Sequence, residues 1–503
     1  MNPSSGRVFL VFVVLACLLS CANAALGVQP DHLRSVEARD KAEEPTASLR
    51  MKGRIFMVSG DPKPGDPSPP VESFFLHRAS GVETELIFDP DHLAALGGER
   101  RIVGRLVEVE LEPMGEESAD IGPLTGGVVR SLRLLNDPTF GEKAFPAKAV
   151  SGAQPWVSIL CKFSDVSDEP KSPSFFQAMY ASTYPGLDHY WRELSYDNVN
   201  VSGSQAVVWV RLPNPVSHYE SSSSDRLTDM ALDCTAAADH LVYFPDFVGI
   251  NMMFNDDFGP YAWGGSRGLS LDGVSKWYRV TWEPPWGYRN IGVIAHEMGH
   301  GFGLPHSNNA DGDGDPYDNP WDVMSNSWGY ARYHSTYGTV GKGTIGHHAN
   351  ILGWISPSQK LDIASSGIYT ATVDNLELQS TTNLRLITVQ IPGSSMHYTV
   401  EVRDRAGYDA NLPGFAVVIH EVDVRRKEDA WLVDAEDPAN GADDGAMWLP
   451  GECFEDEPNE IEICVQSVTT EGFVVRVAYG DTGVIFIDGF ESGGEGSWSL
   501  ASK

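Results

Sequence analysis

The stretch that most constrains this chain runs from Ile291 to His306 and reads IGVIAHEMGHGFGLPH. At about 3.6 residues per turn, its apolar positions 291, 294, 298 and 302 share one helix face. His296 and His300 are four residues apart, so they share a different face, one turn above the other. Gly303 can end this helix with a positive φ, and the turn that follows can bring His306 back. Three imidazoles can bind one zinc ion and leave a fourth position open, as a catalytic zinc requires.

Two further residues complete the predicted centre. Glu297 lies between the helical histidines and can reach a zinc-bound water without binding the metal. Because zinc acidifies its bound water, we expect Glu297 to be the general base that takes the proton and later delivers it to the leaving amine. Met324, in the downstream segment WDVMS, is expected to be a packed floor beneath the histidines.

The spacing H-E-x-x-H-x-x-G-x-x-H, followed by a methionine turn, is the metzincin signature. The residues from His296 to Ser307, with Asp318 to Ser325 after them, resemble the secreted bacterial metallopeptidases related to immune inhibitor A and gametolysin. The resemblance implies a zincin catalytic domain and a secreted zinc endopeptidase that acts on protein or peptide. The chain departs from some metzincins at Asn326, where they carry a tyrosine.

Two alternatives stay open at this point. One is a non-catalytic surface-binding or adhesin protein whose zinc is structural. The other is a zinc hydrolase that acts on a non-peptide bond. An open fourth metal position and a deep cleft would distinguish the peptidase from the binding protein.

The start of the chain is typical of an exported protein. Residues 1–24 combine a basic Arg7, an apolar run from Val8 to Leu19 and an Ala-Asn-Ala cleavage site, as in a signal peptide. Lipid anchoring at Cys21 is disfavoured by the leucines before it. The net charge of −33 argues against nucleic acid or an anionic membrane as a partner, and we expect no membrane span.

Four cysteines remain after removal of the signal peptide, and an even number in an exported chain favours disulfides. They allow three pairings. The pairing of Cys161 with Cys234 and of Cys453 with Cys464 is favoured, because the second pair would close a short acidic loop.

The 503 residues exceed one ordinary domain, and we expect an α+β protein. Strand-like runs predict an N-terminal β-barrel or sandwich with a linker and a propeptide role (25–152), and a C-terminal β-sandwich (356–480). Between them lies the zincin domain (153–355), and a low-complexity tail follows (481–503). With no cysteine at 25–160, only a carboxylate such as Asp61 or Asp66 could block the metal, but we expect both to be ordinary turn aspartates.

Three further features of the catalytic region carry predictions. Val274 to Trp282 alternates as an edge strand would, and could pair with an extended substrate. The alternate aspartates Asp311, Asp313 and Asp315 are candidate calcium ligands, with a solvated acidic loop as the alternative. His347 and His348 precede a packing helix end and are expected to be structural.

Overall fold

The computed structural model describes residues 48–66, 68–114, 126–136, 149–312, 315–435, 442 and 444–480. All of them belong to one compact unit, Ala47–Lys503. The structure mixes helices with several β-sheets, as expected for an α+β protein. The expected signal peptide and C-terminal tail, and most of the linker, lie outside the described residues. Within the described residues, no helix is long and apolar enough to cross a bilayer.

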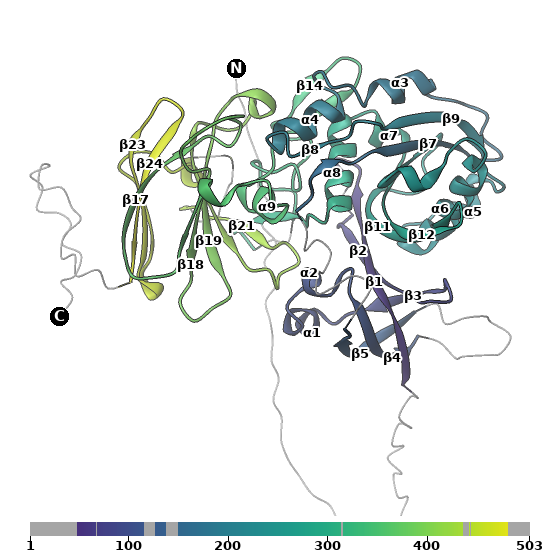
Figure 1. Ribbon diagram of the computed structural model, residues 1–503, viewed down its shortest axis with the longest axis horizontal. Coiled ribbons are helices and arrows are strands. Elements are labelled where there is room, and N and C mark those ends of the chain that lie inside the picture. Colours follow the sequence, from purple (N-terminus) through teal and green to yellow (C-terminus); the bar gives the residue numbers. More distant parts are fainter. Residues whose placement is uncertain are drawn as a thin grey trace, which may run out of the picture. The chain divides into compact units, whose positions relative to one another are not determined.

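The first five strands close into a barrel (Figure 1). Hydrogen-bonded neighbours follow the circuit β1-β2-β3-β5-β4 and return to β1, with β3 and β5 parallel. Apolar side chains at alternate strand positions fill the interior. The bounds are β1 Leu49–Pro62, β2 Val71–His77, β3 Glu83–Ile87, α1 Pro90–Ala95, α2 Glu99–Ile102, β4 Leu106–Pro113 and β5 Gly126–Leu134.

Strand β1 also belongs to a second group of strands. Its first half, Leu49–Arg54, pairs with β4, whereas Val58–Pro62 pairs antiparallel with β11. The sheet then continues in the order β11-β12-β10-β7-β9, in which only β11 runs antiparallel to its neighbours. The bounds are β7 Trp156–Lys162, β9 Gln205–Arg211, β10 Gly249–Phe254, β11 Tyr261–Leu271 and β12 Val274–Glu283.

The prediction that Val274 to Trp282 is an edge strand is wrong. Strand β12 lies between β11 and β10. Only its second half, Arg279–Glu283, pairs with β10, so residues 274–278 have a strand neighbour on one side alone. The first half of β12, residues 274–278, is partly exposed, and this exposure explains the alternating pattern in the sequence. The antiparallel β11 lies beyond β12, and β1 pairs with part of it.

Helices cover both faces of this sheet. Alternate residues of β7 point to opposite sides, so Trp156 and Leu160 pack with helix α8, whereas Val157 and Ile159 pack with α6. A disulfide between Cys161 and Cys234 joins β7 to α6. The bounds are α3 Pro173–Ala178, α4 Leu187–Leu194, α5 Val216–Tyr219, α6 Leu227–Ala238, α7 Pro285–Tyr288, α8 Ile291–Phe302 and α9 Gly346–Ile351. Two short pairings complete this part, β6 Gly152–Ala153 with β8 Val199–Asn200 and β14 Arg332–His334 with β15 Gly338–Val340.

The C-terminal strands form two sheets that share one apolar core, the arrangement of a β-sandwich. One has the order β13-β21-β20-β19-β18-β16 and the other β17-β24-β23-β22. The disulfide of Cys453 and Cys464 joins β22 to β23, so both cysteine pairs are the favoured ones. The bounds are β13 Ser307–Asn309, β16 Lys360–Ile363, β17 Gly367–Asp374, β18 Leu386–Gln390, β19 His397–Arg403, β20 Ala416–Val422, β21 Ala430–Leu432, β22 Cys453–Asp456, β23 Ile461–Val468 and β24 Gly472–Tyr479.

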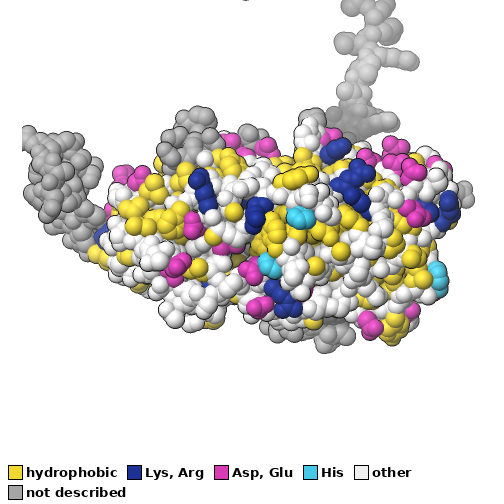
Figure 2. Space-filling model, turned by 90° about the horizontal axis from the view of Figure 1, so that it is seen from above, with side chains coloured by type: hydrophobic (Ala, Val, Ile, Leu, Met, Phe, Trp, Pro, Cys, Tyr) yellow, Lys and Arg dark blue, Asp and Glu magenta, His cyan; other side chains and the backbone are white. Residues whose placement is uncertain are grey.

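Figure 2 shows one face of the molecule, on which acidic, basic and hydrophobic side chains are interspersed. The acidic excess of the sequence is therefore not gathered into a single patch on this face. Such mixing is typical of an ordinary solvated surface.

Candidate metal centre

Helix α8 forms as the apolar spacing predicts. Its stripe of Ile291, Ile294, Met298 and Phe302 lies in the core, and every residue of the helix is buried. Gly303 ends the helix in the left-handed region, with φ of 93°. A helix buried on all sides gives its polar side chains a fixed environment, and so it holds His296 and His300 in place.

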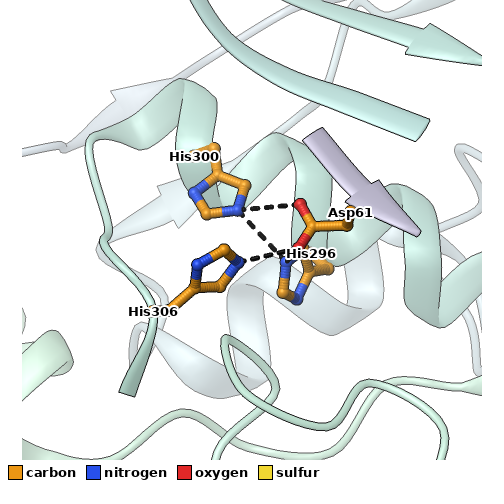
Figure 3. A group of neighbouring side chains, drawn as sticks. All are labelled: Asp61, His296, His300 and His306. Carbon is orange, nitrogen blue, oxygen red and sulfur yellow. Dashed lines mark hydrogen bonds and ion pairs between the residues drawn. The ribbon is translucent and has the colours of Figure 1, made fainter. Parts of the chain in front are cut away.

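The three predicted histidines meet, and a carboxylate meets them (Figure 3). Nε2 of His296 lies 3.1 Å from Nε2 of His300. The carboxylate belongs to Asp61, near the end of β1. Its Oδ1 is 2.8 Å from Nε2 of His306 and 3.3 Å from Nε2 of His296, and its Oδ2 is 3.3 Å from Nε2 of His300.

Backbone carbonyls set the orientation of the two helical imidazoles. His296 donates from Nδ1 to the carbonyl of Val323 at 2.7 Å, and His300 donates from Nδ1 to the carbonyl of Leu304 at 2.9 Å. Each proton is thereby fixed on Nδ1, which leaves the Nε2 lone pair directed at the common centre. Such hydrogen bonds from the far ring nitrogen to a backbone carbonyl are typical of metal-binding histidines.

Glu297 lies beside this group with no exposed surface. Neither of its carboxylate oxygens has a hydrogen-bond partner among the described residues. A buried carboxyl group without partners costs several kcal/mol unless a ligand or metal-bound group satisfies it. This unpartnered pair of oxygens, next to three converging imidazoles, fits a metal site in which Glu297 is not itself a ligand.

The local charges also fit a cation. Burial opposes ionisation of Asp61, but His296 and His306 outweigh it and hold the pKa of Asp61 well below its usual range. Burial lowers the pKa of His306 to about 3, so this imidazole is neutral. Burial, together with Asp61 and Glu283, raises the pKa of Glu297 well above that of a free glutamate. Burial also lowers the pKa of His300, whereas at His296 the charge of Asp61 outweighs burial and raises the pKa. A divalent metal binds such groups as neutral imidazoles and an anionic carboxylate, so its binding would displace a proton from His296.

Met324 packs directly against α8. A Cβ added at Gly299 would lie 2.4 Å from the sulfur of Met324, so only glycine permits this contact. Position 299 lies between the two helical histidines in sequence, and Met324 is fully buried in the same core. Met324 therefore packs beside the helical histidines, and its role as a floor beneath a metal stays a prediction.

Asp61 is not an ordinary turn aspartate, and that prediction is wrong. It lies in the extended strand β1, paired opposite Ala262, and its carboxylate contacts all three histidines. Asp66 does what was expected of both residues, because its side chain accepts a hydrogen bond from the backbone N–H of Ser68 in a turn. The sequence separation of 245 residues between Asp61 and His306 left no local signal for their contact.

Sequence reasoning also missed Tyr317. Its hydroxyl donates to Oδ1 of Asp61 at 2.6 Å, and its ring packs against that of His306. Tyr330, which lies closer to the methionine turn in sequence, is 43% exposed. No spacing rule marks Tyr317, which follows the acidic loop.

That acidic loop is only partly described. Asp313 lies outside the described residues, so calcium binding there stays a prediction. Asp311 donates its backbone N–H to the side chain of Asn309 at 2.7 Å, and Oδ1 of Asp315 accepts from the backbone N–H of Tyr317 at 2.9 Å.

The histidines at 347 and 348 lie in a separate buried network. Nε2 of His347 is 2.9 Å from Oδ2 of Asp429, and Nδ1 of His348 is 2.9 Å from Oδ2 of Asp322. The metal ligands are not among these contacts. The structure therefore assigns both histidines to packing between α9, the methionine turn and the C-terminal sheets, as expected.

A pocket of about 680 Å³ adjoins the centre. His296 and Glu297 belong to its lining. The lining also includes an apolar cluster of Trp286, Val293 and Trp328, and residues 61–66 and 68–70 from the end of β1 and the β1–β2 connection. This is the size and lining of a pocket that can bind a large side chain.

No family model matches the chain, and no curated protein is significantly similar to it. The chemistry of the centre has to be inferred from its own residues.

Proposed function

We propose that the protein is an exported zinc-dependent endopeptidase of metzincin type. The observation that carries the proposal is that three imidazoles converge beside a buried, unpartnered glutamate, which lies on the helix that carries two of them. His296, His300 and His306 would hold the metal. When bound, zinc would supply Lewis-acid activation of water and of a carbonyl.

Glu297 would handle the proton. Its oxygens lie free of other partners in the lining of the pocket, so they are available to a water molecule there. As the general base, ionised Glu297 would take a proton from that water and deliver it to the leaving amine. The hydroxyl of Tyr317, which here donates to Asp61, could instead donate to developing negative charge once that carboxylate has left.

The sheet edge beside the centre supports an extended peptide as the substrate. Strand β11 accepts β1 along Tyr261–Gly265, which demonstrates that this edge can pair with an extended chain. A substrate strand added there would gain main-chain hydrogen bonds, and the pocket would select one side chain. The antiparallel β11 beside parallel strands also fits the cleft edge expected of a zincin fold. The two disulfides are compatible with an extracellular protein.

A second candidate rests on a specific observation. Asp61 completes a set of four buried donors, and structural zinc sites are closed by four protein ligands. A binding or adhesin protein with a structural zinc would have such a site. The difference between the two functions is whether the centre can hydrolyse a peptide once the carboxylate is removed.

The test compares casein hydrolysis by the full chain with that by its Glu297→Gln variant, each alone and combined with Asp61→Asn. We expect the Asp61→Asn chain to cleave casein, a chelator to abolish cleavage, and Glu297→Gln to reduce it by at least ~10²-fold, as for loss of a general base. Glu220→Gln, at an exposed position, serves as the matched control. Zinc-loaded Asp61→Asn protein that leaves casein intact would favour the structural-zinc function.

A further inference from the structure

We propose that His348 of α9 is a positioning residue for the metal centre, in addition to its role in packing. It would act through Asp322 of the methionine turn, which fixes the backbone that orients His296 and the residue that follows His306. His348 itself would bind neither metal nor substrate. The inference rests on the proposed function, because it takes the two histidines of the centre as metal ligands.

The carboxylate of Asp322 fixes the backbone of the methionine turn. Its Oδ1 accepts a hydrogen bond from the backbone N–H of Met324 at 3.1 Å. This hydrogen bond closes a tight turn around Val323, whose carbonyl accepts from Nδ1 of His296 at 2.7 Å. Because that carbonyl sets the orientation of the imidazole, a displacement of Asp322 would also move the Nε2 atom that faces the centre.

The same carboxylate holds the chain just after the third histidine. Oδ2 of Asp322 accepts a hydrogen bond from Oγ of Ser307 at 2.8 Å. Ser307 directly follows His306 and is the first residue of β13. One carboxylate therefore joins two segments of the chain, each of which supports a different imidazole of the centre.

His348 determines where this carboxylate lies. Both side chains are fully buried, and Nδ1 of His348 is 2.9 Å from Oδ2 of Asp322. The other ring nitrogen, Nε2, is 3.6 Å from Oδ1 of Asp429, which directly precedes β21. An imidazole buried between two carboxylates has little freedom to move, so it gives Asp322 a fixed partner.

The charge of His348 strengthens the arrangement. Burial opposes ionisation of Asp322, but the charge of His348, together with the hydrogen bond from Ser307, outweighs burial and holds the pKa of Asp322 well below its usual range. Removal of His348 would leave a buried carboxylate without its cationic partner, which is costly. Asp322 is then expected to move toward other donors, and its hydrogen bonds to Met324 and Ser307 would weaken.

His347 on the same helix offers a matched comparison. It is also buried, and its Nε2 lies 2.9 Å from Oδ2 of Asp429. Its ion pair is therefore with the carboxylate beside β21, and not with the one in the methionine turn. The two adjacent positions allow a histidine that only packs to be compared with one that positions the centre.

The experiment loads the full chain with Co²⁺, whose visible spectrum reports the ligand geometry, and follows release of the ion to a chelator. We expect His348→Gln to change the spectrum and to release Co²⁺ about 10-fold faster or more, as changes to the residues that support metal ligands do. His347→Gln should keep the spectrum and the release rate of the unaltered chain. Both variants should lose stability in urea, because each removes a partner of a buried carboxylate. Identical spectra and rates in all three proteins would overturn the positioning role.

A second variant tests the contacts of Asp322 without removing a buried charge. Ser307→Ala deletes the hydroxyl that donates to Asp322 and leaves the backbone of β13 as it is. We expect it to release Co²⁺ faster than the unaltered chain, but by a smaller factor than His348→Gln. If His348→Gln does not fold, Ser307→Ala decides, because an unchanged spectrum and rate would overturn the link through Asp322 and with it the role of His348.

Casein hydrolysis by the Asp61→Asn chain, with and without His348→Gln, separates this inference from the function on which it rests. No hydrolysis by either protein, with the Co²⁺ results as expected, would support the positioning role and overturn the peptidase function. Hydrolysis with identical spectra and release rates would support the peptidase function and overturn the positioning role. A chain that binds no Co²⁺ would overturn both.

Discussion

Replacing His348 with glutamine is expected to destabilise the protein at pH 6 and to have little effect at pH 10. The imidazole is fully buried between two carboxylates, with Nδ1 2.9 Å from Asp322 and Nε2 3.6 Å from Asp429. Burial opposes its charge, but Asp322 and then Asp429 outweigh burial and raise its pKa to about 9. His347 on the same helix and His420 on β20 also lie nearby, and Arg100 binds Asp429 at 3.2 Å.

The direction in which stability changes with pH follows from proton linkage. The folded-state pKa is raised, so the stabilisation is fully present below the unfolded-state pKa near 6.5. It is lost as the pH rises through about 9. The difference between about 9 and the ordinary 6.5 corresponds to about 3 kcal/mol. The glutamine variant cannot gain this energy at any pH.

The assay is urea unfolding of the unaltered chain and His348→Gln at several pH values from 6 to 10. The gap between their free energies of unfolding should shrink by about 3 kcal/mol across that range. His240→Gln, at an exposed position, is the matched control and should show no such change. A gap that stays constant with pH would refute a charged His348 in the folded state.

Three other predictions follow from close contacts. Gly299→Ala would force Met324 away from α8 and should weaken metal retention against a chelator by about 10- to 100-fold, as changes to the residues that support metal ligands do; unchanged retention would contradict the floor role. Trp328→Ala, in the Asp61→Asn chain, should lower kcat/KM by about 10-fold or more for peptides with a large apolar residue next to the scissile bond, and less for those with alanine there. An equal loss on both peptides would argue against a selective pocket. Arg403→Met should lower the free energy of unfolding by about 3–5 kcal/mol, because the buried arginine binds Asp409 at 2.6 Å; a change below about 1 kcal/mol would contradict it.

The parts of the site that depend on local spacing could be predicted from the sequence. His296 and His300 lie one turn apart on α8, and Gly303 ends the helix as expected. His306 could be included because the turn after the helix is short. These features follow from helix geometry within a few residues, which is where sequence periodicity carries information.

The contribution of Asp61 depends on long-range strand pairing instead. Its position follows from the register of β1 against β11, two strands that lie far apart in the sequence, so the spacing of residues around Asp61 does not predict the contact. The wrong prediction that Val274 to Trp282 is an edge strand has a similar cause. Because β12 is paired on both sides over only half its length, its exposed half gave the whole strand the pattern of an edge. The alternation of polar and apolar residues reports which positions of a strand are exposed. It does not report which strands lie beside it.

The strand after the third histidine has a consequence for how such a protein can evolve. Residues Ser307–Asn309, which follow His306 directly, form β13 and pair with Ala430–Leu432 of the C-terminal sheet. The backbone that anchors one imidazole is thus an integral strand of the sandwich. An exchange of the C-terminal segment between genes would also replace the partner of β13, so the two parts are expected to be inherited together and to tolerate recombination poorly at their junction.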